Sequence, residues 1–117
     1  MRLWLVERGY SDTNLPRGVG VSHNEEFTGR LLSISMWLDR GRDWYVELTP
    51  LGGTVRWHSL GEWGRCIGVN IEDDVYLEPQ LLALRQHLDD FEAMCGEDRL
   101  AETVGCLRRG SRVVPAN

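Results

Sequence analysis

Residues 30–50 read RLLSISMWLDRGRDWYVELTP, and they contain two runs in which apolar and polar side chains alternate. Apolar residues take the even positions of both runs, and a period of two is typical of strands that bury one face. Between the runs lies Asp39-Arg40-Gly41-Arg42, whose glycine suits a turn. We therefore predict a β-hairpin with strands over 30–38 and 43–50.

A helix over residues 23–38 is the alternative for the first run. Ser22 followed by Glu25 is a capping-box pattern, and apolar residues also recur there at helical spacing. We favour the strand because two serines and a glycine are poor helix formers, and because the strand at 43–50 needs a partner.

The hydrophobic pattern also predicts which side chains face each other across the sheet. The pairs predicted for the hairpin are Leu38 with Trp44, Met36 with Val46, and Ile34 with Leu48. A third strand over 54–60 follows the glycine turn at 50–53 and is predicted to pair Val46 with Trp57 and Leu48 with Val55. These strands then share one apolar face, which we expect a helix to cover.

The remaining segments complete an α+β chain. We predict a strand over Arg2–Arg8, a loop over 9–21 and a further strand over 65–71. From Pro79 onward the period becomes helical, with one apolar stripe on Leu81, Leu84, Leu88 and Phe91 and a second on Leu100, Val104 and Leu107. The prediction is an antiparallel β-meander of four to five strands packed against one or two C-terminal helices. It forms a single domain over 1–110, with a flexible tail over 111–117.

Composition narrows the possible chemistry. All thirteen basic residues among the 117 are arginine, which excludes Schiff-base, P-loop and lysine-base mechanisms. The net charge of −5 argues against a nucleic-acid-binding coat. No apolar run is long enough to predict a signal peptide or a membrane span. The cysteines, Cys66, Cys95 and Cys106, are odd in number and lack C-x-x-C spacing, so we predict reduced thiols and a cytoplasmic location.

No cofactor and no metal are predicted. The histidines and cysteines have none of the spacings of known metal sites, and the glycines do not form a phosphate-binding loop. Cys95 and Cys106 lie next to apolar positions of predicted helices, where small buried thiols are common.

The outward face of the predicted sheet carries the most suggestive cluster. Trp37, Tyr45 and His58 form one row across the strands, and Ser35, Glu47 and Arg56 form the next. Rigid aromatic side chains beside charged ones are typical of protein-binding hot spots, although such pairs also simply stabilise sheets. His58 beside Glu47 would in addition be able to transfer protons.

Acidic residues are concentrated in the C-terminal half. Between residues 71 and 98 lie nine acidic side chains and a single arginine, Arg85. Asp89, Asp90 and Glu92 fall outside the apolar stripe of the predicted helix, with Arg85 one turn before Asp89 as an expected ion-pair partner. This surface either promotes solubility or steers a basic partner toward the chain.

Three functional hypotheses follow from the sequence. The first is a non-enzymatic protein-binding module that neutralises or inhibits a protein partner, such as a bacterial toxin immunity or antitoxin-like protein acting on a basic toxin domain. Its expected binding residues are Trp37, Tyr45, Glu47, Arg56, His58, Asp89, Asp90 and Glu92. The alternatives are a small enzyme or ligand-binding domain around His58 and Glu47, with loop 9–21 as a lid, and a homo-oligomeric structural subunit such as a homodimer.

Overall fold

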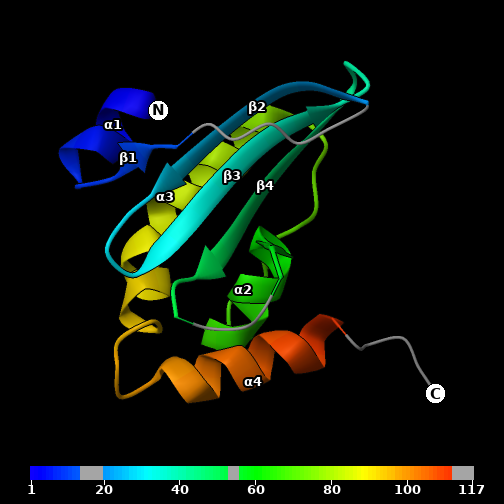
Figure 1. Ribbon diagram of the computed structural model, residues 1–117. Coiled ribbons are helices and arrows are strands. Elements are labelled where there is room, and N and C mark those ends of the chain that lie inside the picture. Colours follow the sequence, from blue (N-terminus) through cyan, green and yellow to red (C-terminus); the bar gives the residue numbers. More distant parts are fainter. Residues whose placement is uncertain (14–19, 53–55, 112–117) are drawn as a thin grey trace.

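The chain forms an α+β structure in which one antiparallel sheet is covered by helices on one face (Figure 1). The computed structural model describes residues 1–13, 20–52 and 56–111. The elements in chain order are α1 (Arg2–Glu7), β1 (Ser11–Asp12), β2 (Val21–Thr28), β3 (Leu32–Asp39), β4 (Asp43–Pro50), β5 (His58–Ser59), α2 (Leu60–Ile67), α3 (Leu77–Ala93) and α4 (Leu100–Ser111). The five strands lie side by side in sequence order, so the predicted meander with C-terminal helices is confirmed.

The central hairpin is β3–β4, and its predicted register is confirmed. Eight residue pairs join the two strands, from Leu32 opposite Pro50 to Asp39 opposite Asp43. They include the three predicted pairs. The turn between the strands takes positive φ angles at Arg40 and Gly41. Glycine adopts this region readily, whereas an arginine there carries a modest strain.

Residues 21–28 settle the choice between helix and strand. They form β2, which pairs antiparallel with β3 and sets Phe27 opposite Ile34. Ser22 and Glu25 therefore lie within a strand, and the helical alternative over 23–38 is wrong. The sheet outweighs the local capping pattern because Phe27 becomes fully buried against its cross-strand neighbours.

The core lies between the sheet and α3, which crosses its covered face (Figure 1). The sheet contributes its predicted even-numbered residues, and α3 contributes three members of the predicted stripe; the fully buried ones are Leu32, Ile34, Leu48, Leu84, Leu88 and Phe91. Each such side chain stabilises the fold by roughly 1.5–3 kcal/mol relative to exposure. At the β5 end, Trp63 of α2 packs against Phe91 with ring centroids 5.5 Å apart.

The N-terminal segment is a helix, so the strand predicted over Arg2–Arg8 is wrong. Arg8, directly after the end of α1, stands one turn beyond Trp4, and its guanidinium lies 4.9 Å from the Trp4 ring centroid. Arg85 of α3 approaches the same ring at 5.4 Å. A short apolar run does not distinguish a strand from a helix by periodicity alone, and here these cation–π contacts suit the helix.

Beyond β4 the prediction fails in register. Only His58 and Ser59 form the last strand, with His58 opposite Leu48 where Val55 was predicted. Residues 53–55 lie outside the described part of the chain. Because the register differs by an odd number of residues, the faces are exchanged and His58 turns toward the core, where it is 5 % exposed.

Residues 65–71 do not form the predicted strand, because α2 occupies residues 65–67 and the chain continues without a strand through residue 71. Ser59 accepts a hydrogen bond from the Glu62 backbone and the Glu62 carboxylate accepts one from Ser59, a complete capping box. Gly68 ends the helix at φ 78°. Gly64 lies so close to the following segment that a Cβ there would be 2.8 Å from the Val69 carbonyl oxygen.

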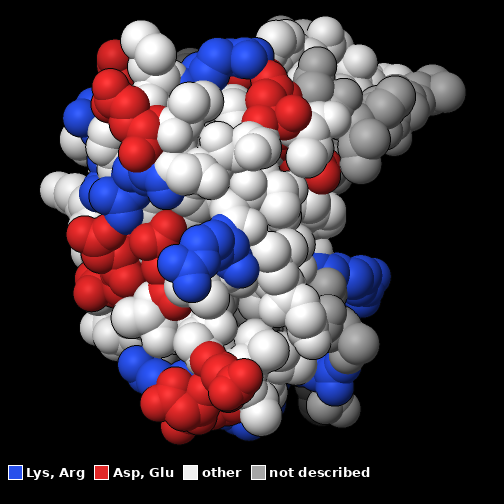
Figure 2. Space-filling view, turned by 60° about the vertical axis from the view of Figure 1, so that its left-hand side comes forward, with Lys and Arg blue, Asp and Glu red and all other residues white. Residues whose placement is uncertain are grey.

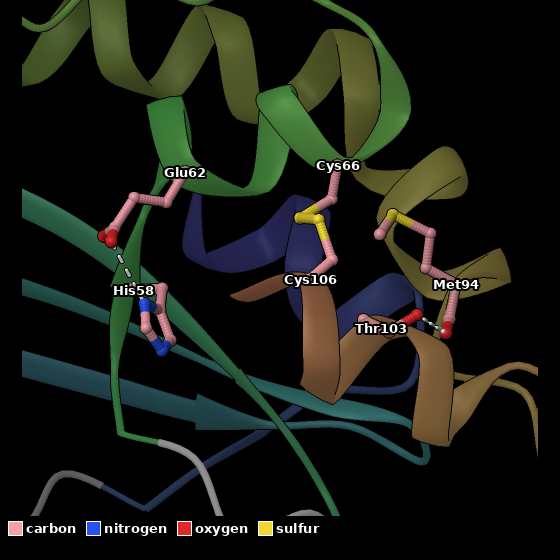
Figure 3. Close-up of a disulfide and its surroundings, with 6 residues drawn as sticks. All are labelled: His58, Glu62, Cys66, Met94, Thr103 and Cys106. Carbon is pink, nitrogen blue, oxygen red and sulfur yellow. Dashed lines mark hydrogen bonds and ion pairs between the residues drawn. A yellow bond between two sulfur atoms is a disulfide. The ribbon is translucent and has the colours of Figure 1, made fainter. Parts of the chain in front are cut away.

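A disulfide between Cys66 of α2 and Cys106 of α4 joins these helices (Figure 3), which contradicts the prediction of reduced thiols. The two cysteines are 40 residues apart in sequence, so no short spacing signalled the bond. The predicted cytoplasmic location loses the support that it drew from reduced thiols. Cys95 is a free, buried thiol, as expected for a core cysteine.

The C-terminal helices begin and end slightly differently from the prediction. α3 begins at Leu77, two residues before Pro79, and ends at Ala93, before Gly96. α4 extends to Ser111, and residues 112–117 of the predicted tail lie outside the described part. Within the described ranges, no helix has the length and apolar character needed to cross a membrane.

Candidate functional site

The predicted neighbours Trp37 and Tyr45 form a stacked aromatic pair on the outward face of the sheet. Their ring centroids are 4.6 Å apart and the ring planes differ by 21°. The Trp37 indole N–H donates to the Glu47 carboxylate at 2.8 Å. Stacking and this hydrogen bond fix two side chains that extend from adjacent strands, so the surface is rigid before any partner arrives.

The alternation of β3 and β4 explains why these side chains meet. Trp37, Tyr45 and Glu47 occupy odd positions, opposite in direction to the core residues. Tyr45 is 38 % exposed, whereas Ser35 on the same face is fully buried. The outward face is therefore open at Tyr45, half-buried at Trp37 and closed at Ser35, next to Glu47.

A groove of about 650 Å³ begins beside the aromatic pair, at the edge of β4 that faces away from β3. Tyr45, Val46 and Glu47 form one wall, and the start of α2, residues 71–75 and the first turns of α3 form the others. Its apolar surface comes from Val46, Leu60, Ile71, Val75, Pro79 and Ala83. This volume is in the range of sites that bind small molecules or protruding side chains.

The side chain of Gln80 closes the β4 edge within this groove. Its Oε1 accepts from the Val46 N–H at 2.9 Å, and its Nε2 donates to the Trp44 carbonyl at 2.9 Å. The same Nε2 also contacts the carbonyl oxygens of Asp74 and Tyr76, at 3.0 and 3.1 Å. The carboxamide thus replaces the donor and acceptor that a neighbouring strand would supply.

The charged residues that line the groove are all acidic: Glu47, Glu72, Asp73 and Asp74. In the described ranges no arginine or histidine forms an ion pair with Glu72, Asp73 or Asp74. The Asp74 carboxylate accepts from the Tyr76 N–H at 2.8 Å. Asp73 lies against Gly61 of α2, where a Cβ would be 3.3 Å from its carboxylate oxygen. The groove is therefore a negatively charged hollow.

His58 and Arg56 do not join this site, contrary to the prediction. His58 is buried, and its Nδ1 lies 3.2 Å from Glu62 Oε2 (Figure 3). Arg56 is exposed in the segment before β5, and Ser59 takes the predicted place opposite Glu47. Burial pushes the pKa of Glu62 upward, but the Ser59 N–H and His58 outweigh it and lower the pKa.

Asp89 and Glu92 are engaged by the N-terminal segment, and Arg85 is not their partner. Arg8 forms ion pairs with both carboxylates, and the Tyr10 hydroxyl donates to Glu92 at 2.6 Å. Hydrogen bonding to Asp89 raises the pKa of Arg8, and burial with the Glu92 contact raises the pKa of Tyr10. Arg85 instead lies over the Trp4 ring.

Asp90 is exposed, as Asp89 is, but no arginine pairs with it in the described ranges, and its carboxylate lies 3.8 Å from His87 Nδ1. Figure 2 shows the side of the molecule on which α1 and β1 lie, where arginines and acidic residues alternate over the surface. The predicted acidic recognition surface on α3 is thus largely neutralised, and the acidic groove beside β4 is a separate place.

No group of three or more His, Cys, Asp or Glu side chains that could hold a metal occurs among the described residues. Burial raises the pKa of the Cys95 thiol to about 12, so this cysteine is a poor nucleophile near neutral pH.

The sequence reasoning identified the aromatic pair and missed two features of the site. Ser59-Leu60-Gly61-Glu62 is a capping-box pattern that could have revealed α2 and with it the end of the sheet. Gln80 carried no signal, because an isolated glutamine on a helix does not indicate where its carboxamide will bind.

Comparison with known proteins adds no relative: no protein-family model, no curated protein and no solved structure matches the chain.

Proposed function

We propose that this chain is a non-enzymatic protein-binding module that neutralises or inhibits a protein partner, in the manner of a toxin immunity or antitoxin-like protein. The observation that carries the proposal is the stacked Trp37–Tyr45 pair, whose exposed member Tyr45 lines an acidic groove. Tryptophan and tyrosine are enriched among the residues that dominate binding energies. Their fixed geometry lowers the entropy that a partner's docking must overcome.

Charge supports a basic partner. The groove is lined by four carboxylates, and the whole chain carries a net charge of −5. Complementary charge speeds encounter and disfavours wrong partners. A basic catalytic domain whose active site accepts this surface would be blocked by it.

The enzyme alternative has less support than before. That alternative requires His58 and Glu47 to transfer protons at one site, yet His58 faces the core and contacts Glu62. The groove still favours a ligand-binding alternative, because its volume suits a small molecule. Light scattering tests the third hypothesis, since a homodimer in dilute solution would support a structural subunit.

The location of the partner is part of the proposal. Disulfides persist in oxidising compartments and are rare in the cytosol. The Cys66–Cys106 bond therefore weighs against the cytoplasmic location predicted from the sequence and in favour of a partner met outside the cytosol.

The test is affinity capture with matched variants. We would immobilise the wild type, Tyr45→Ala and Leu82→Ala, the last removing another exposed apolar side chain that lies outside the groove. The product of the adjacent gene is the first candidate partner. We expect the wild type and Leu82→Ala to retain the same basic protein, to suppress its toxicity when co-expressed, and to bind it about 30-fold more tightly than Tyr45→Ala does. Equal retention by all three proteins, or no selective retention by any, would contradict the proposal.

A further inference from the structure

The carboxylates of the groove differ from those that the N-terminal arginines bind. Arg2 pairs with Asp12 and Glu25 at 2.6 and 3.6 Å, and Arg8 pairs with Asp89 and Glu92 of α3. Glu72, Asp73 and Asp74 have no such ion pair within the described ranges, and they surround a hollow with apolar walls. A cation in this groove would be attracted by several negative charges. It would not have to displace an arginine of the described chain from them.

The aromatic pair supplies a second feature that suits a cation. Trp37 covers one face of the Tyr45 ring at 4.6 Å, and Tyr45 itself lines the groove. The ring therefore offers its remaining face on the groove side. Cations bind favourably over the faces of aromatic rings, and more so where water is partly excluded.

We infer that the groove receives an arginine side chain from the protein partner, with its guanidinium against Tyr45 and paired with Asp73 and Asp74. The aliphatic part of the side chain then lies on the apolar walls formed by Leu60, Ile71 and Val75. This inference rests on the proposed function and specifies the partner's chemistry: a basic segment that projects an arginine.

The geometry favours arginine over lysine. A guanidinium is planar, so it stacks on a ring and at the same time presents N–H groups in its own plane to carboxylates. An ammonium group is compact and strongly hydrated, and it gains less from the ring and the paired acids. The groove should therefore distinguish the two cations, whereas a general acidic surface would attract both alike.

Short peptides test the inference without a known partner. We would titrate ¹⁵N-labelled protein with Ac-Gly-Arg-Gly-Arg-Gly-NH₂ and with the same peptide carrying lysines, and follow backbone amide shifts. We expect shifts confined to residues 45–47 and 72–75, with the arginine peptide binding about fivefold more tightly. Equal affinities, or shifts scattered over the surface, would overturn the arginine site.

Charge-matched variants separate the groove from general attraction. Asp73→Asn with Asp74→Asn should weaken the arginine peptide about tenfold, because both carboxylates pair with the guanidinium. Glu7→Gln with Glu97→Gln removes the same charge at exposed positions outside the groove and should change the affinity less than twofold. An equal loss in both double variants would overturn the inference. Amide spectra of the free variants confirm that each is folded.

The inference and the proposed function fail in different ways. If a partner is retained through Tyr45 but the arginine peptide does not bind in the groove, the proposed function is supported and the arginine site is contradicted. If the arginine peptide binds selectively but no partner is captured, the arginine site is supported and the inhibitory function is contradicted.

Discussion

The two edges of β4 are closed in different ways. On the β3 side, eight consecutive backbone pairs run the full length of the strand. On the other side, β5 supplies two residues, and single groups bind further backbone atoms. The Val75 carbonyl and the Gln80 carboxamide bind Trp44 and Val46, and the Trp63 indole donates to the Leu48 carbonyl at 3.0 Å. One edge therefore depends on a repeating pattern, and the other depends on single residues held by helices.

This difference explains why the groove lies where it does. A full neighbouring strand would cover Tyr45 and Val46, whereas a glutamine side chain satisfies the backbone and leaves space beside it. Unpaired strand edges invite aggregation, so closure by side chains also protects the chain. The second edge can thus carry a binding site beside backbone groups of Trp44 and Val46 that already have partners.

Loss of the disulfide should have the largest effect, because it fixes α2, the helix that carries Trp63. Replacement of Cys66 and Cys106 by serine, or reduction, should lower the free energy of unfolding by about 4 kcal/mol, from the unfolded-chain entropy of a 40-residue loop. Urea denaturation with and without reductant measures this loss. Amide exchange should accelerate more in β5 and α2 than in β3.

The serine variant provides the control for that experiment, because reductant should leave its stability unchanged. Thiol titration of the unreduced, unfolded wild type should find Cys95 alone, and three thiols after reduction. Three thiols before reduction, or a midpoint insensitive to reductant, would show that the helices are not joined in this way.

Gln80→Leu should have the next largest effect and should act on one edge of β4 only. It leaves the Val46 N–H and the Trp44 carbonyl without their side-chain partner, which costs about 1–3 kcal/mol. Hydrogen exchange at the Val46 amide should accelerate, while amides in the β3–β4 ladder stay protected. Gln86→Leu, on the exposed face of α3, is the matched control and should change stability by less than about 0.5 kcal/mol. Equal effects of the two variants would show that Gln80 does not close the edge.

The difference between the two edges of β4 also explains which parts of the sheet the sequence could predict and which it could not. The β3–β4 register follows from alternation on both sides of a short turn, which is local information, and it places Trp37 beside Tyr45 as predicted. The β4–β5 register depends on where α2 begins, which the capping box of Ser59 and Glu62 marks, and on a core that accepts His58, which depends on residues distant in sequence. The predicted β4–β5 register was wrong by an odd number of residues, and this placed His58 on the wrong face of the sheet.

Two further errors come from contacts between residues that are distant in sequence. Arg8 reaches Asp89 and Glu92 across about 80 residues of chain, and Cys66 reaches Cys106 across 40. Neither contact leaves a local pattern, so the acidic residues of α3 looked free and the cysteines looked reduced. The groove was missed for this reason too, since its walls come from β4, α2, α3 and residues 71–75.

The smallest expected effect concerns Glu62, which starts the helix that supports the second edge. Its pKa is lowered in the folded chain, because the Ser59 N–H and His58 outweigh the opposing effect of burial. The carboxylate form therefore stabilises the fold above the ordinary glutamate pKa of about 4.3, and this contribution is lost as the pH falls through the lowered value.

Glu62→Gln keeps the capping box, since glutamine also suits that position, and removes only the charge. Urea midpoints should show the wild type more stable than the variant at pH 6, by up to about 1 kcal/mol, with the difference shrinking toward pH 3. Glu97→Gln, at an exposed position outside the helices, should show no such convergence. If the urea midpoints of the wild type and Glu62→Gln differ by the same amount from pH 6 to pH 3, the charge of Glu62 does not help to hold α2 at the β4 edge.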